Sequence, residues 1–129
     1  MAISTTDRFD NGTIRIIFAN KEAVAAIRNK QTNPWPDGSI LAKTLWKQEI
    51  SSEGIVSTGE FIHVEYMIKD TKKYASTQGW GWARWKGDTL IPFGSSAIFV
   101  NDCINCHRPV RNNDNVFTKP LNLINLKKN

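Results

Sequence analysis

The 129 residues include two cysteines, which stand three positions apart and are followed by a histidine, in the run Cys103-Ile104-Asn105-Cys106-His107. Two thiols at this spacing lie on one side of a turn, where both can add to the two vinyl groups of a haem. The adjacent histidine can then place its imidazole beneath the iron as the proximal ligand. The motif therefore predicts haem c bound covalently through Cys103 and Cys106, with His107 as the metal ligand.

Three other uses of the motif fit the sequence less well. A structural zinc site needs four ligands, and His63 is the only histidine besides His107. A thioredoxin-like dithiol opens a helix after a buried parallel strand, whereas Pro109 and the polar run after it disfavour a long helix there. A disulfide explains neither the histidine nor the spacing. We therefore favour haem over all three.

The second axial position of the iron has two candidate ligands apart from Met1, namely His63 and Met67. Both fall in the strand expected at residues 61–68, where a period of two places them on one face. We interpret His63 as a surface or packed strand residue and Met67 as a core residue. The iron is then five-coordinate, with one face open to a small molecule. A six-coordinate electron-transfer cytochrome is the alternative.

The chain before the motif reads mainly as strands. Runs rich in β-branched and aromatic residues, which favour strands, occur at residues 12–18, 39–46, 61–68 and 79–85. Residues 50–60 are polar and indicate a connection. Residues 97–101 are expected to lead into the motif as an extended segment, and the polar tail from Asn112 is expected to wrap the surface.

Two short helices complete the expected fold. Asn20 is a good N-cap for a helix over residues 21–28, and Asp70 could cap another over residues 71–75. We predict one domain over residues 1–129 of the α+β class, mostly antiparallel β-sheet with a few short helices and the c-type haem motif near the C-terminus.

Composition narrows the possible partners. The formal net charge is +5, but the basic residues are scattered, with no stripe that would indicate nucleic-acid binding. No apolar run approaches the roughly 20 residues of a membrane-spanning helix, and residues 4–11 are too polar for a signal peptide. Because haem is joined to such motifs outside the cytoplasm, we expect an export signal on the precursor and a periplasmic mature protein.

Several segments, taken in order, resemble the cytochrome P-460 family, which includes the cytochromes c prime-beta. The matching segments are Thr13-Ile14-Arg15, residues 35–43, 64–70 and 79–82, Cys103 to His107, and residues 116–118. The resemblance implies a mostly antiparallel sheet, a periplasmic homodimer and a haem with one open axial face. In cytochrome P-460 proper a lysine side chain is also bonded to the haem ring, and the protein oxidises hydroxylamine. The c prime-beta members lack that bond and bind nitric oxide in an apolar pocket.

Lys43 occupies the place of the cross-linking lysine in the resemblance. On the expected strand it shares a face with Leu41 and Leu45, so it either points into an apolar site or extends out at its edge. Its flexible stem and a pKa that falls on burial would suit a nucleophile. An exposed strand lysine is the alternative that periodicity alone favours slightly, and the resemblance reverses that balance.

Two further residues are expected near the haem. By resemblance Arg15 hydrogen-bonds a haem propionate or an iron-bound ligand, with a surface arginine as the alternative. Phe99 is expected to make the pocket apolar.

Hydroxylamine oxidation benefits from a base that accepts substrate protons, and the sequence does not single out a carboxylate for this role. The tryptophans at positions 80, 82 and 85 are expected in the core.

These observations predict a mono-haem oxidoreductase with Lys43 and Arg15 as catalytic residues. It would oxidise hydroxylamine opposite His107 and pass electrons to a partner cytochrome. A nitric oxide binder or scavenger without the cross-link is the first alternative. An electron-transfer cytochrome is the second.

Overall fold

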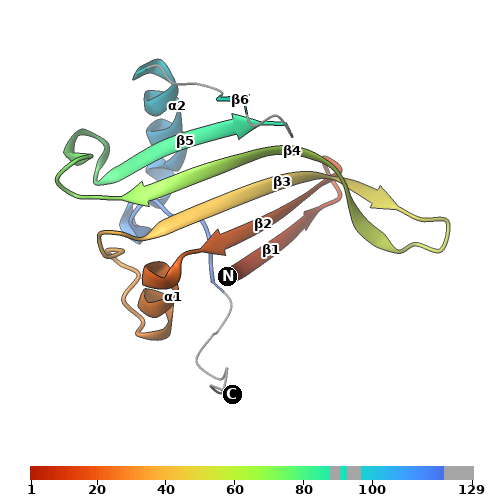
Figure 1. Cartoon of the computed structure of the whole chain (residues 1–129), viewed down its shortest axis with the longest axis horizontal. Coiled ribbons are helices and arrows are strands. Elements are labelled where there is room, and N and C mark those ends of the chain that lie inside the picture. The colour runs from red at the N-terminus through yellow and green to blue at the C-terminus, as the bar shows by residue number, and fades with distance from the viewer. Residues whose placement is uncertain (88–90, 93–96, 121–129) are drawn as a thin grey trace.

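One antiparallel sheet forms the centre of the molecule (Figure 1). This computed structural model describes residues 1–87, 91–92 and 97–120. Within them the sheet has six strands, each paired with the next along the chain in the order β1-β2-β3-β4-β5-β6. Their bounds are β1 Ala2–Arg8, β2 Thr13–Ala19, β3 Ile40–Ile50, β4 Val56–Lys69, β5 Trp80–Lys86 and β6 Ile91–Pro92.

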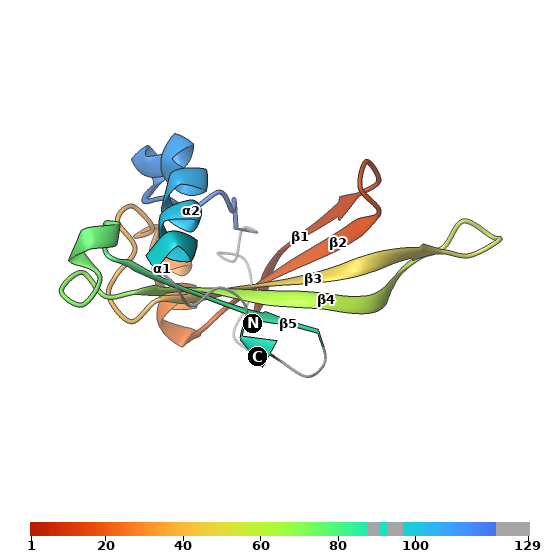
Figure 2. The ribbon, with the colours of Figure 1, turned by 90° about the horizontal axis from the view of Figure 1, so that it is seen from above.

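Two α-helices accompany the sheet in the described residues. Helix α1 (Lys21–Arg28) joins β2 to β3, and α2 (Ala97–His107) follows β6. Figure 2 shows α2 standing on one face of the sheet. A short 3-10 turn, η1 (Ala75–Thr77), precedes β5, and a second, η2 (Arg108–Asn113), follows α2. The predicted α+β class with a mostly antiparallel sheet is confirmed.

The core lies where α1, the sheet and the segment after η2 meet. It includes the fully buried rings and chains of Trp80 and Ile3, together with the small residues Ala23 and Ala26 of α1. Val116 is also buried in this cluster. Part of the tail that we expected to wrap the surface is therefore core, and it fixes the end of η2 against the sheet.

Helix α1 begins and ends as predicted, because its cap satisfies several backbone groups at once. The Asn20 side-chain oxygen accepts hydrogen bonds from the backbone N–H groups of Ala23 (3.1 Å) and Ile40 (3.0 Å). Its amide nitrogen donates to the Gly38 carbonyl at 2.8 Å. The cap therefore ties the start of α1 to the start of β3.

Asn20→Ala is expected to lower the free energy of unfolding by about 2 kcal/mol, the upper end for N-cap losses. The reason is that the substitution leaves helix and strand N–H groups without an acceptor. Urea titration followed by circular dichroism measures the change. Asn29→Ala, at the other end of the same helix, serves as the control. An equal loss in both variants would contradict the role given to the Asn20 cap.

The β3–β4 hairpin is longer than predicted. The polar connection expected over residues 50–60 is confirmed for residues 51–55 and wrong at its ends, which belong to the two strands. Strand pairing continues through Gln48 opposite Thr58 to Ile50 opposite Val56. Ile50 is 55% exposed, and the hairpin projects beyond the rest of the sheet (Figure 1). A strand pair exposed on both faces needs no apolar alternation, which is why its polar sequence indicated a loop.

Strand β1 was not predicted, because residues 4–8 are polar. It is an edge strand, paired only with β2, and its register places Thr6 opposite Arg15. Ile3 anchors it in the core. An edge strand can remain largely polar on both faces.

Two other segments also differ from the prediction. Residues 71–74 form turns rather than a helix. The Asp70 carboxylate accepts from the N–H groups of Lys72 and Lys73, as the expected cap would, but the chain then continues into the 3-10 turn η1. Residues 97–101 are helical, not extended, because α2 begins at Ala97. Pro109 agrees with the structure: it stands in η2, just beyond the end of α2.

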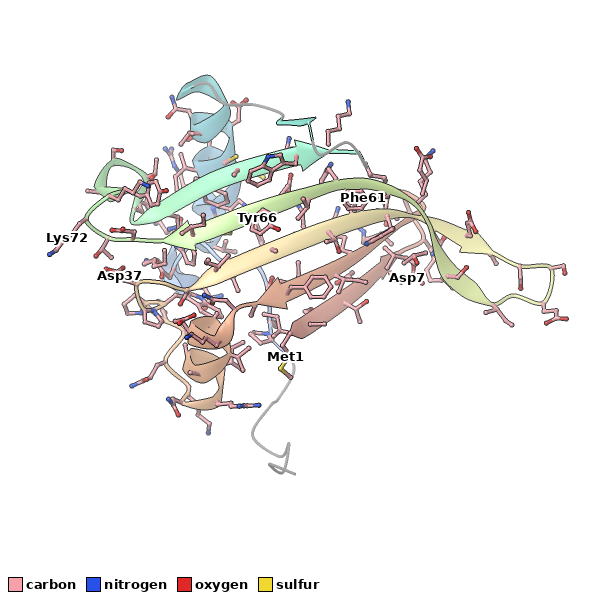
Figure 3. All side chains as sticks on the ribbon, viewed as in Figure 1. Met1, Asp7, Asp37, Phe61, Tyr66 and Lys72 are labelled. Carbon is pink, nitrogen blue, oxygen red and sulfur yellow. The ribbon has the colours of Figure 1, made fainter. Side chains whose placement is uncertain are left out.

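The face of the sheet turned away from α2 carries aromatic side chains (Figure 3). Phe61 lies against Trp46 with ring centroids 4.9 Å apart, and Tyr66 lies edge-on to Trp85 at 5.2 Å. Trp85 is only half-buried. The tryptophans at positions 80, 82 and 85 were predicted to lie in the core. The prediction is confirmed for Trp80 and wrong for Trp85.

Candidate functional site

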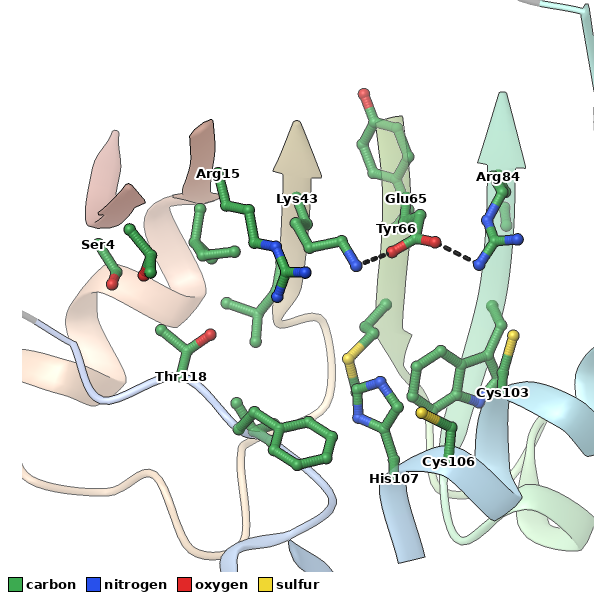
Figure 4. A pocket seen from close by; sticks show the side chains of 18 of the residues that line it. Ser4, Arg15, Lys43, Glu65, Tyr66, Arg84, Cys103, Cys106, His107 and Thr118 are labelled. Carbon is green, nitrogen blue, oxygen red and sulfur yellow. Dashed lines mark ion pairs between the residues drawn. The ribbon is translucent and has the colours of Figure 1, made fainter. Parts of the chain in front are cut away.

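The cysteine motif faces a large cavity between α2 and the sheet (Figure 4). The cavity has a volume of about 1180 Å³, and Cys103, Cys106 and His107 all line it. Its other walls come from strands β1 to β5 and from residues 116–119. Because α2 is helical to its last residue, it presents both thiols and the imidazole to the same space.

The imidazole of His107 is fixed on three sides. Its Nδ1 lies 2.6 Å from the Asn115 carbonyl oxygen, and because a carbonyl can only accept, Nδ1–H is the donor. The rings of Trp82 and Phe117 pack against it at centroid distances of 4.5 and 4.8 Å. Burial lowers the pKa of His107, which favours the neutral ring. Nε2 is then the nitrogen with a lone pair for a metal.

The two cysteines are free thiols. Burial raises the pKa of the Cys103 thiol, so it stays protonated at neutral pH. In the described part of the chain no group of three or more His, Cys, Asp or Glu side chains gathers as a metal site. Those residues therefore offer no ligand set for structural zinc. The pair also stands at the end of a helix rather than at its start, unlike a thioredoxin-like dithiol.

A row of charged side chains lies across the cavity from the motif (Figure 4). Lys43 of β3 is opposite Glu65 of β4, which is opposite Arg84 of β5. The Glu65 carboxylate forms ion pairs with both cations, and Nε2 of His63 lies 3.5 Å from it. The strand register, which places these three residues side by side, makes the row.

The Glu65 carboxyl is ionised at neutral pH. Burial raises its pKa, but the Lys43 ammonium and the Arg84 guanidinium outweigh burial and hold the pKa below its ordinary value. The cavity therefore has a neutral imidazole on one side and a stabilised carboxylate on the other.

These residues fit a haem c. Its attachment needs two thiols three positions apart and one imidazole nitrogen directed into the same space, and α2 provides them. A flat apolar ring would also find aromatic and aliphatic walls in Trp82, Phe117 and Met67. Arg15 also lines the cavity, where its guanidinium group could donate to an anionic group.

Comparison with protein families agrees with this geometry. A family model described as Cytochrome P460 matches residues 1–118. This chain belongs to the cytochrome P460 family. Membership in this cytochrome family implies a haem protein. A comparison with curated proteins gave no match.

In this cytochrome P460 chain, the structure brings most of the predicted site residues together. Lys43 and Arg15 line the same cavity as the Cys-x-x-Cys-His motif. Phe99 lies in α2, and its side chain is outside the described residues. None of the helices in the described ranges is both long and apolar enough to cross a membrane.

The residues considered as second axial ligands differ in position. Met67 lines the cavity and packs against the core, whereas His63 is half-buried beside Glu65. Trp82 packs against the core, as expected, and also forms part of the cavity wall against His107. Its place follows from the pairing of β4 with β5, which sets it opposite Met67.

The sequence analysis missed Glu65 and Arg84. A signal for Glu65 was present, because it stands between His63 and Met67 on one strand face at a period of two. The strand alternation of residues 80–86 likewise sets Arg84 on the same face as Trp82. What the sequence lacked was the register that aligns these strands.

Proposed function

We propose that this cytochrome P460 family member is a periplasmic mono-haem oxidoreductase that oxidises hydroxylamine. The observation that carries the proposal is the ionised Glu65 between two cations, facing His107 across one cavity. A substrate placed between them would meet a proton acceptor on the side opposite the proximal histidine. The family resemblance further implies a homodimer and a partner cytochrome, which remain predictions.

The motif would hold the cofactor. Each thiol of Cys103 and Cys106 would add its S–H across a vinyl group, giving two thioethers, and Nε2 of His107 would bind the iron. Bound haem would supply a metal that accepts electrons from a nitrogenous substrate and passes them to a redox partner. Arg15, which lines the cavity, would donate to a propionate or to the bound ligand.

Glu65 would act as the general base. Hydroxylamine must release protons as it loses electrons, and a positioned carboxylate accepts them. Before the cross-link forms, Lys43 and Arg84 both hold this carboxylate ionised, and in the cross-linked protein the ion pair with Arg84 would continue to do so. Glu65 therefore supplies the base that the sequence did not single out.

Lys43 would carry the cross-link to the haem ring. Its amine lies in the cavity, and its ion pair with Glu65 places a proton acceptor beside it. The Lys43 ammonium would first give one proton to Glu65. The new carbon–nitrogen bond would replace a carbon–hydrogen bond of the ring, and an added peroxide would accept the two electrons and two further protons released.

The direct test combines peptide mass spectrometry with turnover of hydroxylamine by the matured protein and an artificial oxidant. We expect haem peptides joined through Lys43, and Lys43→Ala should remove both the cross-link and most of the rate. Lys47→Ala, an exposed lysine on the same strand, is the matched control and should keep both. A Lys43→Ala variant with full rate would refute the role of Lys43.

A second function has its own support. The Lys43 ammonium is ion-paired with Glu65, and a protonated amine is not a nucleophile. Trp82, Phe117 and Met67 give the cavity apolar walls. A protein without the cross-link would bind nitric oxide there. In the same experiment an unmodified Lys43 peptide, nitric oxide binding and no turnover would favour this function.

A further inference from the structure

A buried ion pair lies behind the proximal histidine, outside the cavity. Lys69, the last residue of β4, is 3% exposed, and its Nζ donates to both carboxylate oxygens of Asp114, at 2.8 and 2.7 Å. Neither residue lines the cavity. The proposed chemistry therefore makes no direct use of this pair.

Asp114 is held by more than Lys69. Its carboxylate accepts from the backbone N–H of Trp35 at 2.8 Å, and its carbonyl accepts from the indole N–H of Trp80 at 2.8 Å. The Lys69 ammonium also lies 5.0 Å from the centroid of the Trp80 ring. Three elements far apart in the sequence thus converge on one residue.

The backbone at this point has an unusual conformation. Asp114 and Asn115 both have left-handed φ angles, 51° and 61°, a conformation that Asp and Asn adopt more readily than other residues with a Cβ atom. Asn115 is itself 2% exposed, and its side chain donates to Gln78 at 3.0 Å. The contacts of Asp114 and Asn115 therefore fix the position of this turn.

This turn carries the carbonyl that accepts from His107. The Asn115 oxygen is adjacent to the anchored Asp114 and lies 2.6 Å from Nδ1 of His107. A partner of this kind fixes the ring orientation of a metal-bound histidine and increases its electron donation. Asp114 is both a member of the ion pair and the neighbour of Asn115, so the pair helps to fix the position of the Asn115 oxygen.

A stability role alone explains the pair poorly. Taking two charges out of water costs several kcal/mol per ion, and apolar replacements of similar volume are often neutral or stabilising. An ion pair does, however, fix the direction of its partners better than an apolar contact. The pair lies next to the Asn115 carbonyl that accepts from His107, so it can fix the direction of that carbonyl.

We propose that Lys69 and Asp114 are positioning residues for the proximal ligand, which hold the Asn115 carbonyl against His107 and thereby tune the iron. The inference rests on the proposed haem ligation by His107. Loss of the pair is expected to lengthen the His107 hydrogen bond, weaken electron donation by the imidazole and favour the reduced iron.

The test is the double variant Lys69→Met/Asp114→Asn in the matured holoprotein, which leaves no lone buried charge. We expect a lower iron–histidine stretching frequency in the resonance Raman spectrum of the ferrous protein. We also expect roughly a tenfold shift in the reduction equilibrium, which is about 59 mV upward for one electron. Lys47→Met/Glu60→Gln, at an exposed ion pair of the long hairpin, is the matched control and should shift neither.

A second variant covers the case in which the double variant does not fold. Asn115→Ala keeps the ion pair but strains the left-handed turn, so it should lower the frequency in the same direction. Unchanged frequency and potential in every variant that folds with haem would overturn the inference. Wild-type protein without haem or without an iron–histidine band would instead overturn the proposed function.

Discussion

His107→Ala is expected to remove the proximal ligand of the iron while the two thioethers keep the haem attached. The iron–histidine band should disappear from the Raman spectrum. Hydroxylamine oxidation should fall by more than the roughly 10- to 100-fold that losing an outer partner of a metal ligand costs. The physical reason is that no other described imidazole lines the cavity, since His63 lies beside Glu65 outside its lining.

Two controls make this result specific. His63→Ala changes the other histidine and should keep the iron–histidine band. Added imidazole should restore part of the signal in His107→Ala, because it can enter the space that the side chain leaves. A band that survived His107→Ala would show that another residue binds the iron and would contradict our account.

Glu65→Gln is expected to lower hydroxylamine turnover by about 10²- to 10⁴-fold, the usual contribution of a positioned general base. The amide keeps the shape of the side chain but cannot accept a substrate proton. Steady-state rates with an artificial oxidant measure the loss. Glu60→Gln, an exposed carboxylate on the same strand, is the control. Full turnover in Glu65→Gln would exclude Glu65 as the base.

The pH dependence of Glu65 follows from its lowered pKa. Because Lys43 and Arg84 hold the folded-state pKa below the ordinary value of 4.5, the carboxylate stays ionised throughout the neutral range. Its contribution to stability is fully present above the unfolded-state pKa and is lost as the pH falls through the folded-state pKa. Turnover that depends on Glu65 should likewise fall only in acid.

The motif, the class of fold and helix α1 could be predicted because each depends on neighbouring residues. The haem-attachment motif is complete within the five residues Cys103 to His107. Asn20 caps a helix that immediately follows it. Alternation of residue types likewise placed most strands to within a few residues. These signals depend on residues close together in the sequence, so they can be recognised before the fold is known.

The parts of the site that could not be predicted depend on strand register and on contacts between residues far apart in the sequence. Glu65 becomes a candidate base only when pairing sets it between Lys43 and Arg84. The ion pair of Lys69 and Asp114 joins residues 45 positions apart, and neither residue stands in a recognisable motif. The contact of Trp82 with His107 could not be predicted for the same reason, since it crosses from β5 to α2.

The central claim is that haem is bound covalently at Cys103 and Cys106, with His107 on the iron and the opposite side open. The most direct measurement is the intact mass of the matured protein, recorded under denaturing conditions together with its absorption spectrum. We predict the mass of the polypeptide plus one haem and a spectrum of iron with one vacant axial position. A colourless protein with the mass of the polypeptide alone, or one that retains zinc instead of iron, would contradict the account.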